Sequence, residues 1–179
     1  MEATYIIIGV VLLLVIIFIA ISNKIARAVV KIDEASSGID VALTKRYDVL
    51  TKAIDVVKSY AKHEKDVIFS TIELRKNMTI EQKNETNKKM DGEFAKINAL
   101  AENYPELRSS DNFVQLQKSI TDVEEHLQAA RRLYNSNVSS YNQLLVTFPS
   151  SLIASMKGCK KMEFFETEEK KKEDVKIDL

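Results

Sequence analysis

The stretch from Asp111 to Pro149 reads DNFVQLQKSITDVEEHLQAARRLYNSNVSSYNQLLVTFP, and its apolar residues recur every seven positions. Two series with this period lie three residues apart, as in the a and d positions of a coiled-coil seam. The first series is Phe113, Ile120, Leu127, Tyr134, Tyr141 and Phe148, and the second is Leu116, Val123, Ala130, Asn137 and Leu144. The stretch therefore predicts one long helix that packs its seam against other helices and that ends at Pro149.

The same stretch contains the pair Tyr-Asn twice, at Tyr134–Asn135 and at Tyr141–Asn142, among other Asn and Ser residues that form helices poorly. The seven-residue period places both tyrosines in the core, with hydroxyls that need partners at its edge. Asn137 is the polar residue of the second series, and such a residue can fix register at a cost in stability. Asn135 and Asn142 lie one position outside the seam. They either hydrogen-bond a neighbouring helix or loop, or form a polar surface that another subunit recognises.

An uncharged run of 21 residues extends from Ala3 to Asn23. About 20 such residues cross the hydrocarbon core of a bilayer as a helix, so the run predicts a transmembrane anchor over residues 1–23. A cleaved signal peptide is the alternative, but it would have a basic start and an apolar core of only ~7–15 residues. Lys24, Arg27 and Lys31 follow the run and no Lys or Arg precedes it, which predicts an N-terminus outside and a cytoplasmic remainder.

The first helix is expected to leave the membrane without a break. Apolar residues at spacings of three and four continue after the anchor to about Asn77. Arg46 and Glu64 lie in or beside this stripe, and we place both at its boundary. A second helix is expected from Ile80, and Pro105 follows it. Thr79 and Gln82 have capping-box spacing before the second helix.

A short fourth helix is expected after Pro149, with Leu152, Ile153 and Met156 pointing inward and Gly158 at its end. The charged stretch ETEEKKKEDVKIDL at 166–179 is expected to be disordered or loosely helical. The sequence thus predicts an all-α fold, in which one N-terminal transmembrane helix continues into a long antiparallel up-and-down bundle of three long helices plus a short fourth. The predicted domains are the anchor at 1–23, the bundle at 24–158 and the charged tail at 159–179.

Composition and motifs argue against several kinds of chemistry. The chain has 26 basic and 26 acidic residues, and this balance argues against binding to nucleic acid. A di-iron site in a bundle needs two Glu-x-x-His pairs, and neither His63 nor His126 belongs to one. Cys159 is the single cysteine, and there is no glycine-rich phosphate loop. We therefore expect no cofactor, no metal and no enzymatic activity.

Six blocks of the sequence resemble the LemA family of membrane-anchored bacterial proteins, in the order typical of that family. They are IDVALTKRYDVL (39–50), VKSYAKHEKDV (57–67), AENYPELRSSDNFVQLQ (101–117), RRLYNSNVSSYN (131–142), FPSSLIA (148–154) and KKMEFFE (160–166). Thr51 and Lys52 stand where the family usually has Pro-Asn. The resemblance implies a four-helix bundle behind one transmembrane helix, at the bacterial inner membrane, and no settled activity. Relatives are associated with membrane shaping and with membrane proteases.

Unequal helix lengths suggest how such a protein would work. If the second helix returns along the first, it reaches about Ala53 and leaves residues 24–45 without a neighbouring helix from the same chain. An apolar stripe lies there, formed by Ile25, Val29, Ile32, Ile39 and Leu43. We expect this stripe to bind copies of the same protein and so build a homo-oligomeric scaffold that contacts membrane lipids, such as a membrane-shaping coat. The alternatives are an adaptor for another membrane protein, such as a protease, or a tail that folds back onto the stripe.

Overall fold

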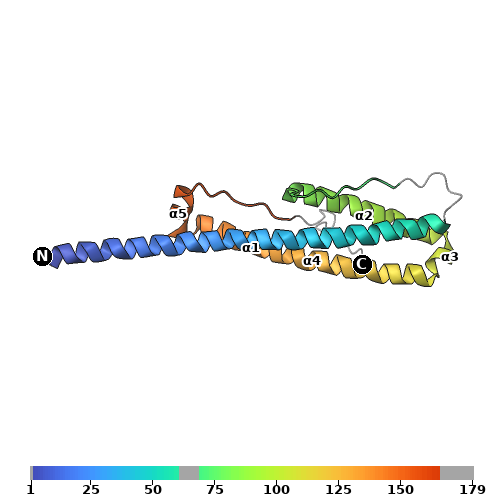
Figure 1. The fold of residues 1–179 in the computed structure, drawn as a ribbon, viewed down its shortest axis with the longest axis horizontal. Coiled ribbons are helices and arrows are strands. Elements are labelled where there is room, and N and C mark those ends of the chain that lie inside the picture. The colour runs from blue at the N-terminus through green and yellow to red at the C-terminus, as the bar shows by residue number, and fades with distance from the viewer. Residues whose placement is uncertain (1, 61–68, 166–179) are drawn as a thin grey trace, which may run out of the picture. The chain divides into compact units, whose positions relative to one another are not determined.

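The computed structural model describes residues 2–60 and 69–165, which form helices joined by non-helical segments and contain no β-strand (Figure 1). The helices are α1 (Glu2–Tyr60), α2 (Ile80–Asn103), α3 (Pro105–Arg108), α4 (Asp111–Val146) and α5 (Ser150–Met156). The predicted all-α fold with a helical bundle is therefore confirmed. The described residues divide into a first unit (2–37 and 133–164) and a second unit (38–60, 69–132 and Phe165), so α1 and α4 contribute to both.

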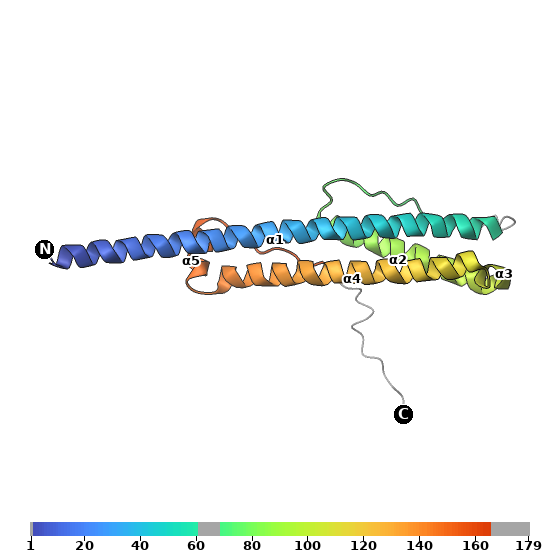
Figure 2. The ribbon, with the colours of Figure 1, turned by 60° about the horizontal axis from the view of Figure 1, so that its bottom comes forward.

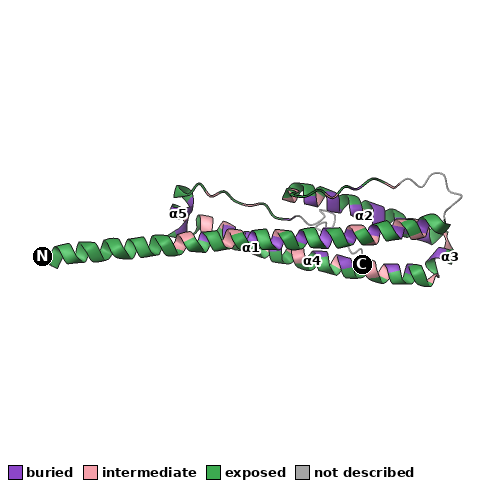
Figure 3. Ribbon diagram, in the orientation of Figure 1, coloured by how far each residue is buried: buried purple, intermediate pink, exposed green. Residues whose placement is uncertain are grey.

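Helix α1 is continuous over 59 residues and includes the whole apolar run, as the sequence predicts. The side chains of this run are exposed except for those of Ile21 and Ser22, which are half-buried, so the described part of the chain leaves most of the run uncovered (Figure 3). The helix also continues through Thr51 and Lys52, where the Thr51 hydroxyl donates to the carbonyl of Tyr47 at 3.0 Å. The absence of the Pro-Asn pair thus leaves an unbroken helix at this point.

In the second unit, α2 runs in the same direction as α1. Lys83 pairs with Asp40 at 2.7 Å, and Arg46, further along α1, contacts Asp91, further along α2. The expectation that the second helix returns along the first is therefore wrong. Helix α4 runs opposite to α2, because Gln117 near its start donates to Asn98 near the end of α2. A shared core of α1, α2, α3 and α4 side chains includes Leu50, Ala53, Val57, Met90, Phe94, Ile97, Leu107, Phe113 and Leu116.

A non-helical segment at 69–79 makes the parallel arrangement possible. Phe69 lies beside Lys58 near the end of α1, whereas residues 74–78 line one hollow together with residues 40–44. The segment therefore returns along α1, and its eleven residues can span up to ~36 Å when extended. The apolar spacing continues in the sequence and predicts a first helix that extends to about Asn77. That prediction is wrong beyond Tyr60 for the described residues, and Asn77 adopts a left-handed turn conformation with φ 60°.

The predicted ends of the other helices agree with the structure. Gln82 donates its backbone N–H to Thr79 Oγ1, and Thr79 returns the bond to Gln82 Oε1, which forms the predicted capping box. The Ser110 hydroxyl accepts from the Phe113 N–H at the start of α4. Gly158 follows α5 with φ +66°, a conformation that glycine adopts without steric cost.

Arg46 ties three helices together in the core of the second unit. Its side chain is 1% exposed, and its guanidinium contacts the Asn87 side chain, Asp91 and Glu124. A longer bond of 3.3 Å reaches the carbonyl of Asn87, and the guanidinium carbon lies 5.2 Å from the centre of the Phe94 ring. The placement of Arg46 at the boundary is therefore wrong, while Glu64 lies outside the described residues. A buried cation needs such partners, because an unpaired buried charge is costly.

The first unit is built from the start of α1, the end of α4, α5 and residues 157–164. The two long helices lie side by side in both views (Figures 1 and 2). Asn137 donates its amide N–H to the carbonyl of Lys31 at 3.0 Å, which fixes their register. The side chains buried in this unit are Ile25, Ile32, Ala35, Tyr134, Val138, Tyr141, Ile153 and Ala154.

Replacing Arg46 by methionine should lower the free energy of unfolding by about 2–4 kcal/mol, because it removes the cation and leaves its carboxylate partners facing one another. The loss should stay below the ~5 kcal/mol of a fully buried pair, since Asp91 and Glu124 retain solvent contact. Urea unfolding of the full chain in mild detergent, followed by circular dichroism, measures the difference. Arg132→Met on the exposed face of α4 is the control, and equal stability of both variants would contradict a stabilising network.

Candidate functional site

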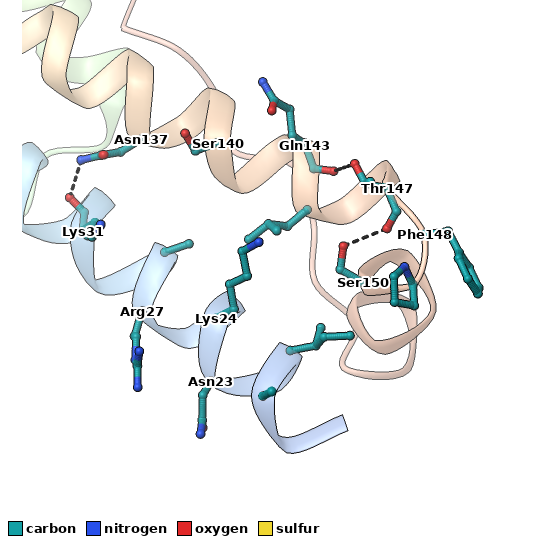
Figure 4. Close-up of a pocket in the computed structure, with 15 residues that line it drawn as sticks. Asn23, Lys24, Arg27, Lys31, Asn137, Ser140, Gln143, Thr147, Phe148 and Ser150 are labelled. Carbon is teal, nitrogen blue, oxygen red and sulfur yellow. Dashed lines mark hydrogen bonds between the residues drawn. The ribbon is translucent and has the colours of Figure 1, made fainter. Parts of the chain in front are cut away.

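A groove of ≈ 920 Å³ lies in the first unit where the apolar run of α1 ends (Figure 4). One wall is α1 from Ala20 to Lys31, and the other is α4 with the turn that leads into α5. The groove is lined by Ala20, Ile21, Asn23, Lys24, Arg27, Ala28, Lys31, Asn137, Ser140, Gln143, Leu144, Thr147, Phe148, Pro149 and Ser150. It therefore combines the last apolar turn of the run with the cations that follow it.

Three cations give the groove its chemical character. Lys24 reaches from α1 toward α4, whereas Arg27 points to the other side of α1 (Figure 4). In the ranges that the structure describes, no ion pair joins Lys24, Arg27 or Lys31 to a carboxylate. Hydroxyl groups on the α4 wall are already used, since Thr147 donates to Gln143 O at 2.7 Å. The groove can thus attract anions.

The Tyr-Asn pairs of α4 hold the segment that follows α5. Tyr134 donates to the carbonyl of Glu163 and Tyr141 to that of Lys160, both at 3.1 Å. Asn142 makes two bonds with Met162, because its amide donates to Met162 O and its oxygen accepts from Met162 N–H, both at 2.9 Å. These side chains act as an edge to which residues 160–163 are hydrogen-bonded.

The surroundings of the two tyrosines keep their hydroxyls protonated. Burial raises the pKa of Tyr134, and the negative charges of Glu163 and Asp33 raise it further. Burial also raises the pKa of Tyr141, with a smaller contribution from Cys159 beside it. A raised pKa means that each tyrosine remains a hydrogen-bond donor at neutral pH. Both therefore suit a structural role better than that of a catalytic base.

These contacts confirm part of the predicted motif. Tyr134 and Tyr141 are core residues with partnered hydroxyls, and Asn142 hydrogen-bonds a neighbouring segment, as the first of the two interpretations expected. Asn135 is half-buried and has a polar interaction within the chain. Asn137 is half-buried as well, because the adjacent Val138 takes the fully buried position.

The end of the predicted seam is wrong. Phe148 is 76% exposed and Pro149 is exposed, because α4 ends at Val146 and the chain turns away before the seam would reach them. The inward face of α5 is also partly wrong. Ile153 is buried as expected, but its neighbour Ala154 takes the second inner position, so Leu152 and Met156 point outward. The predicted core positions are therefore wrong where a regular helix is interrupted.

The membrane-proximal stripe is already covered by its own chain. Ile25, Ile32, Ile39 and Leu43 are buried and Val29 is half-buried. The premise that residues 24–45 lack a neighbouring helix is wrong, because α4 lies beside α1 in the first unit and α2 pairs with it from Asp40 in the second.

The first residues of the predicted tail pack against helices, whereas disorder was expected only for the charged residues 166–179. Residues 160–163 are hydrogen-bonded to α4, and Phe165 is buried in the second unit beneath Arg131, whose guanidinium carbon lies 5.2 Å from its ring centre. The rest of the tail lies outside the described residues. The two adjacent phenylalanines, Phe164 and Phe165, indicate in the sequence that this part of the tail packs, since a segment that remains in water seldom carries them.

The burial of two cations, Arg46 and Lys83, was not predicted. Arg46 occupies a regular stripe position between Leu43 and Leu50, at spacings of three and four, so its burial could be read from the pattern. Lys83 is buried too and pairs with Asp40. Both cations link helices and neither faces the groove.

The residues considered for metal or thiol chemistry are the two histidines and the single cysteine. No group of three ligand side chains that could hold a metal occurs in the described ranges. His126 lies on the exposed surface of α4, and His63 lies outside the described residues. Cys159 is half-buried beside Tyr141.

Replacing Asn142 by alanine should cost about 1–3 kcal/mol of stability, because the backbone groups of Met162 lose both partners. Hydrogen exchange of residues 159–165 should become faster in the same variant. Ser136→Ala on the exposed side of α4 is the matched control. Unchanged stability and exchange, combined with lost assembly, would instead favour a polar surface that another subunit recognises.

Comparison with known proteins matches residues 35–179 to the LemA family. Protein LemA of Metamycoplasma hominis is 26% identical over 168 residues, which cover 89% of this chain and 75% of that protein. Magnetosome protein MamQ of Magnetospirillum gryphiswaldense is 29% identical over 72 residues, which cover 40% of this chain and 26% of that protein. Magnetosome protein MamQ 2 of Paramagnetospirillum magneticum is 30% identical over 73 residues, which cover 41% of this chain and 27% of that protein. The family match includes most of the chain, and the chain belongs to the LemA family.

Proposed function

We propose that this protein is a non-enzymatic, membrane-anchored helical scaffold. The observation that carries the proposal is the uncovered apolar run, which continues without a break into a folded bundle. Contiguous apolar surface of this size does not remain in water. At 1.5 Å per residue the 21 uncharged residues measure about 32 Å, close to the ~30 Å of a bilayer core.

The bundle supports a mechanical role more than a chemical one. Its buried cations Arg46 and Lys83 bind carboxylates of neighbouring helices, and its buried tyrosine hydroxyls bind backbone carbonyls. Polar groups that satisfy one another in this way stiffen a fold and leave few groups free for a substrate. A rigid helical body on a membrane stalk is suited to holding other molecules at the membrane surface.

We further propose that the N-terminus lies outside and the bundle in the cytoplasm, at a bacterial inner membrane. The three cations after the run support this orientation, because positive charge near a span stays on the cytoplasmic side. The relatives named above are bacterial proteins, which supports the bacterial membrane.

Self-association is the finer part of the proposal, and the covered stripe no longer supports it. Two exposed valines of α1, Val30 and Val41, lie eleven residues apart and so share one side of the helix after three turns. Exposed apolar residues in register along a rigid helix are suited to packing against a second copy. An adaptor for another membrane protein, such as a protease, is the alternative that the same surface would serve.

Cysteines at Val30 and Val41 should give disulfide-linked dimers upon oxidation in native membranes, in a background with Cys159→Ser. The matched control is Ile32→Cys, which is buried and should give no dimer. Light scattering of the detergent extract then measures the mass of the particle. Crosslinks to a different protein, together with a stoichiometric complex that contains it, would favour the adaptor. Monomers alone would contradict both self-association and the adaptor.

The orientation predicts opposite labelling of two engineered cysteines in the same Cys159→Ser background. Glu2→Cys should react with a membrane-impermeant maleimide on intact cells, because it precedes the span. Lys157→Cys, in the exposed residue after α5, should react only after the membrane is permeabilised. The reverse pattern would contradict the orientation, and labelling of both sites on intact cells would indicate that the protein is secreted.

A further inference from the structure

The short helix α5 has apolar residues on two opposite sides. Ile153 and Ala154 are buried against the first unit. Phe148, Leu152 and Met156, which follow at intervals of four residues, are 76%, 59% and 77% exposed. Leu152 and Met156 are four residues apart and so share one side of α5, while Phe148 lies in the turn before it. We call these three exposed residues the outer face. The described part of the chain does not cover the outer face.

The outer face belongs to a corner that adjoins the end of the apolar run. Phe148, Pro149 and Ser150 line the same groove as Ala20 and Ile21, which belong to that run (Figure 4). Ala20 and Ile21 lie two to three residues before the end of the uncharged run at Asn23. That is less than ~5 Å along the helix, so the corner is level with the boundary of the hydrocarbon core. Helix α5 also runs across the direction of α1 (Figure 1).

The charges around this corner are all positive. No Asp or Glu occurs between Phe148 and Met162, whereas Lys157, Lys160 and Lys161 do. Likewise, no acid occurs in α1 from Ala20 to Ile32, where Lys24, Arg27 and Lys31 lie. Apolar side chains bordered by cations, at the level where a membrane span ends, are typical of segments that lie in the headgroup region of a bilayer.

We infer that α5 and its preceding turn form a second membrane contact, in which Phe148, Leu152 and Met156 enter the bilayer that the apolar run crosses. The chemical class bound is anionic phospholipid, since six cations flank the contact. The inference rests on the proposed membrane anchor. An amphipathic segment of this kind inserts ~5–10 Å into the boundary between headgroups and acyl chains. A helix lying across α1 is oriented for this, because α1 crosses the membrane.

The consequence is that the first unit is held at the membrane at two points. A single span leaves the bundle free to tilt and rotate, whereas a second contact beside it restricts both. Each lysine near an anionic surface adds about 1 kcal/mol of attraction, so the contact should strengthen as the content of anionic lipid rises. A scaffold held in this way would present its first unit at a defined angle to the membrane.

The test uses the full chain with Cys159→Ser, reconstituted in vesicles of phosphatidylcholine with or without phosphatidylglycerol. An environment-sensitive NBD label is placed at Leu152→Cys, and the quenchers are lipids brominated near the headgroup for this position and near the chain ends for the anchor position. Leu133→Cys is the matched control, because Leu133 is also 58% exposed but lies on α4 away from the corner. Leu12→Cys reports the anchor itself. We expect blue-shifted, quenched emission at 152 and 12 and neither effect at 133, with stronger quenching at 152 when phosphatidylglycerol is present.

The outcomes separate this inference from the anchor on which it rests. Quenching at 12 without quenching at 152 would overturn the second contact and leave the anchor standing. Absence of quenching at both would contradict the anchor. A blue shift at 152 that bromine does not quench and that rises with protein density would assign the outer face to a second copy instead. Changing Lys157, Lys160 and Lys161 to Gln should reduce quenching at 152 in anionic vesicles and leave it unchanged at 12.

Discussion

The apolar stripe of α1 must be covered, and the rest of the structure depends on how the chain does so. In the second unit the stripe packs against α2 and α4, with Arg46 as the central polar link. In the first unit the last turns of α4 cover the stripe. The hydrogen bond from the Asn137 amide to the Lys31 carbonyl fixes the register of α4 against α1. A helix that leaves a membrane with an apolar side needs such cover along its whole length, because water begins where the lipid ends.

The length of α4 follows from this requirement, and the position of α5 follows from the length of α4. Thirty-six residues of α4 measure about 54 Å, enough to serve both units. The helix ends beside Ala20 and Ile21, and the chain must turn there because the neighbouring part of α1 belongs to the apolar run. The Tyr-Asn edge then holds the returning segment at 160–163. A polar motif that resembles an active site is thus a means of closing the bundle.

Much of this architecture could be predicted from periodicity and capping signals. The seven-residue series located α4, the capping box located the start of α2, and the uncharged run located the apolar part of α1. The path between α1 and α2 could not be predicted, because apolar residues at 67–74 have a spacing that suits a helix equally well. That one error reversed the direction of α2 and made the stripe of α1 look uncovered. The groove was not predicted either, because its two walls come from residues more than a hundred positions apart.

The central claim is that one chain covers its own membrane-proximal stripe. Amide hydrogen exchange of α1 residues 25–43, measured on the dilute monomer in detergent, tests it most directly. We expect slow exchange there, comparable with residues 50–57 in the core of the second unit, and no further slowing at high protein concentration. Fast exchange in the monomer that becomes slow only when the protein assembles would contradict the account and return the stripe to an interface between copies.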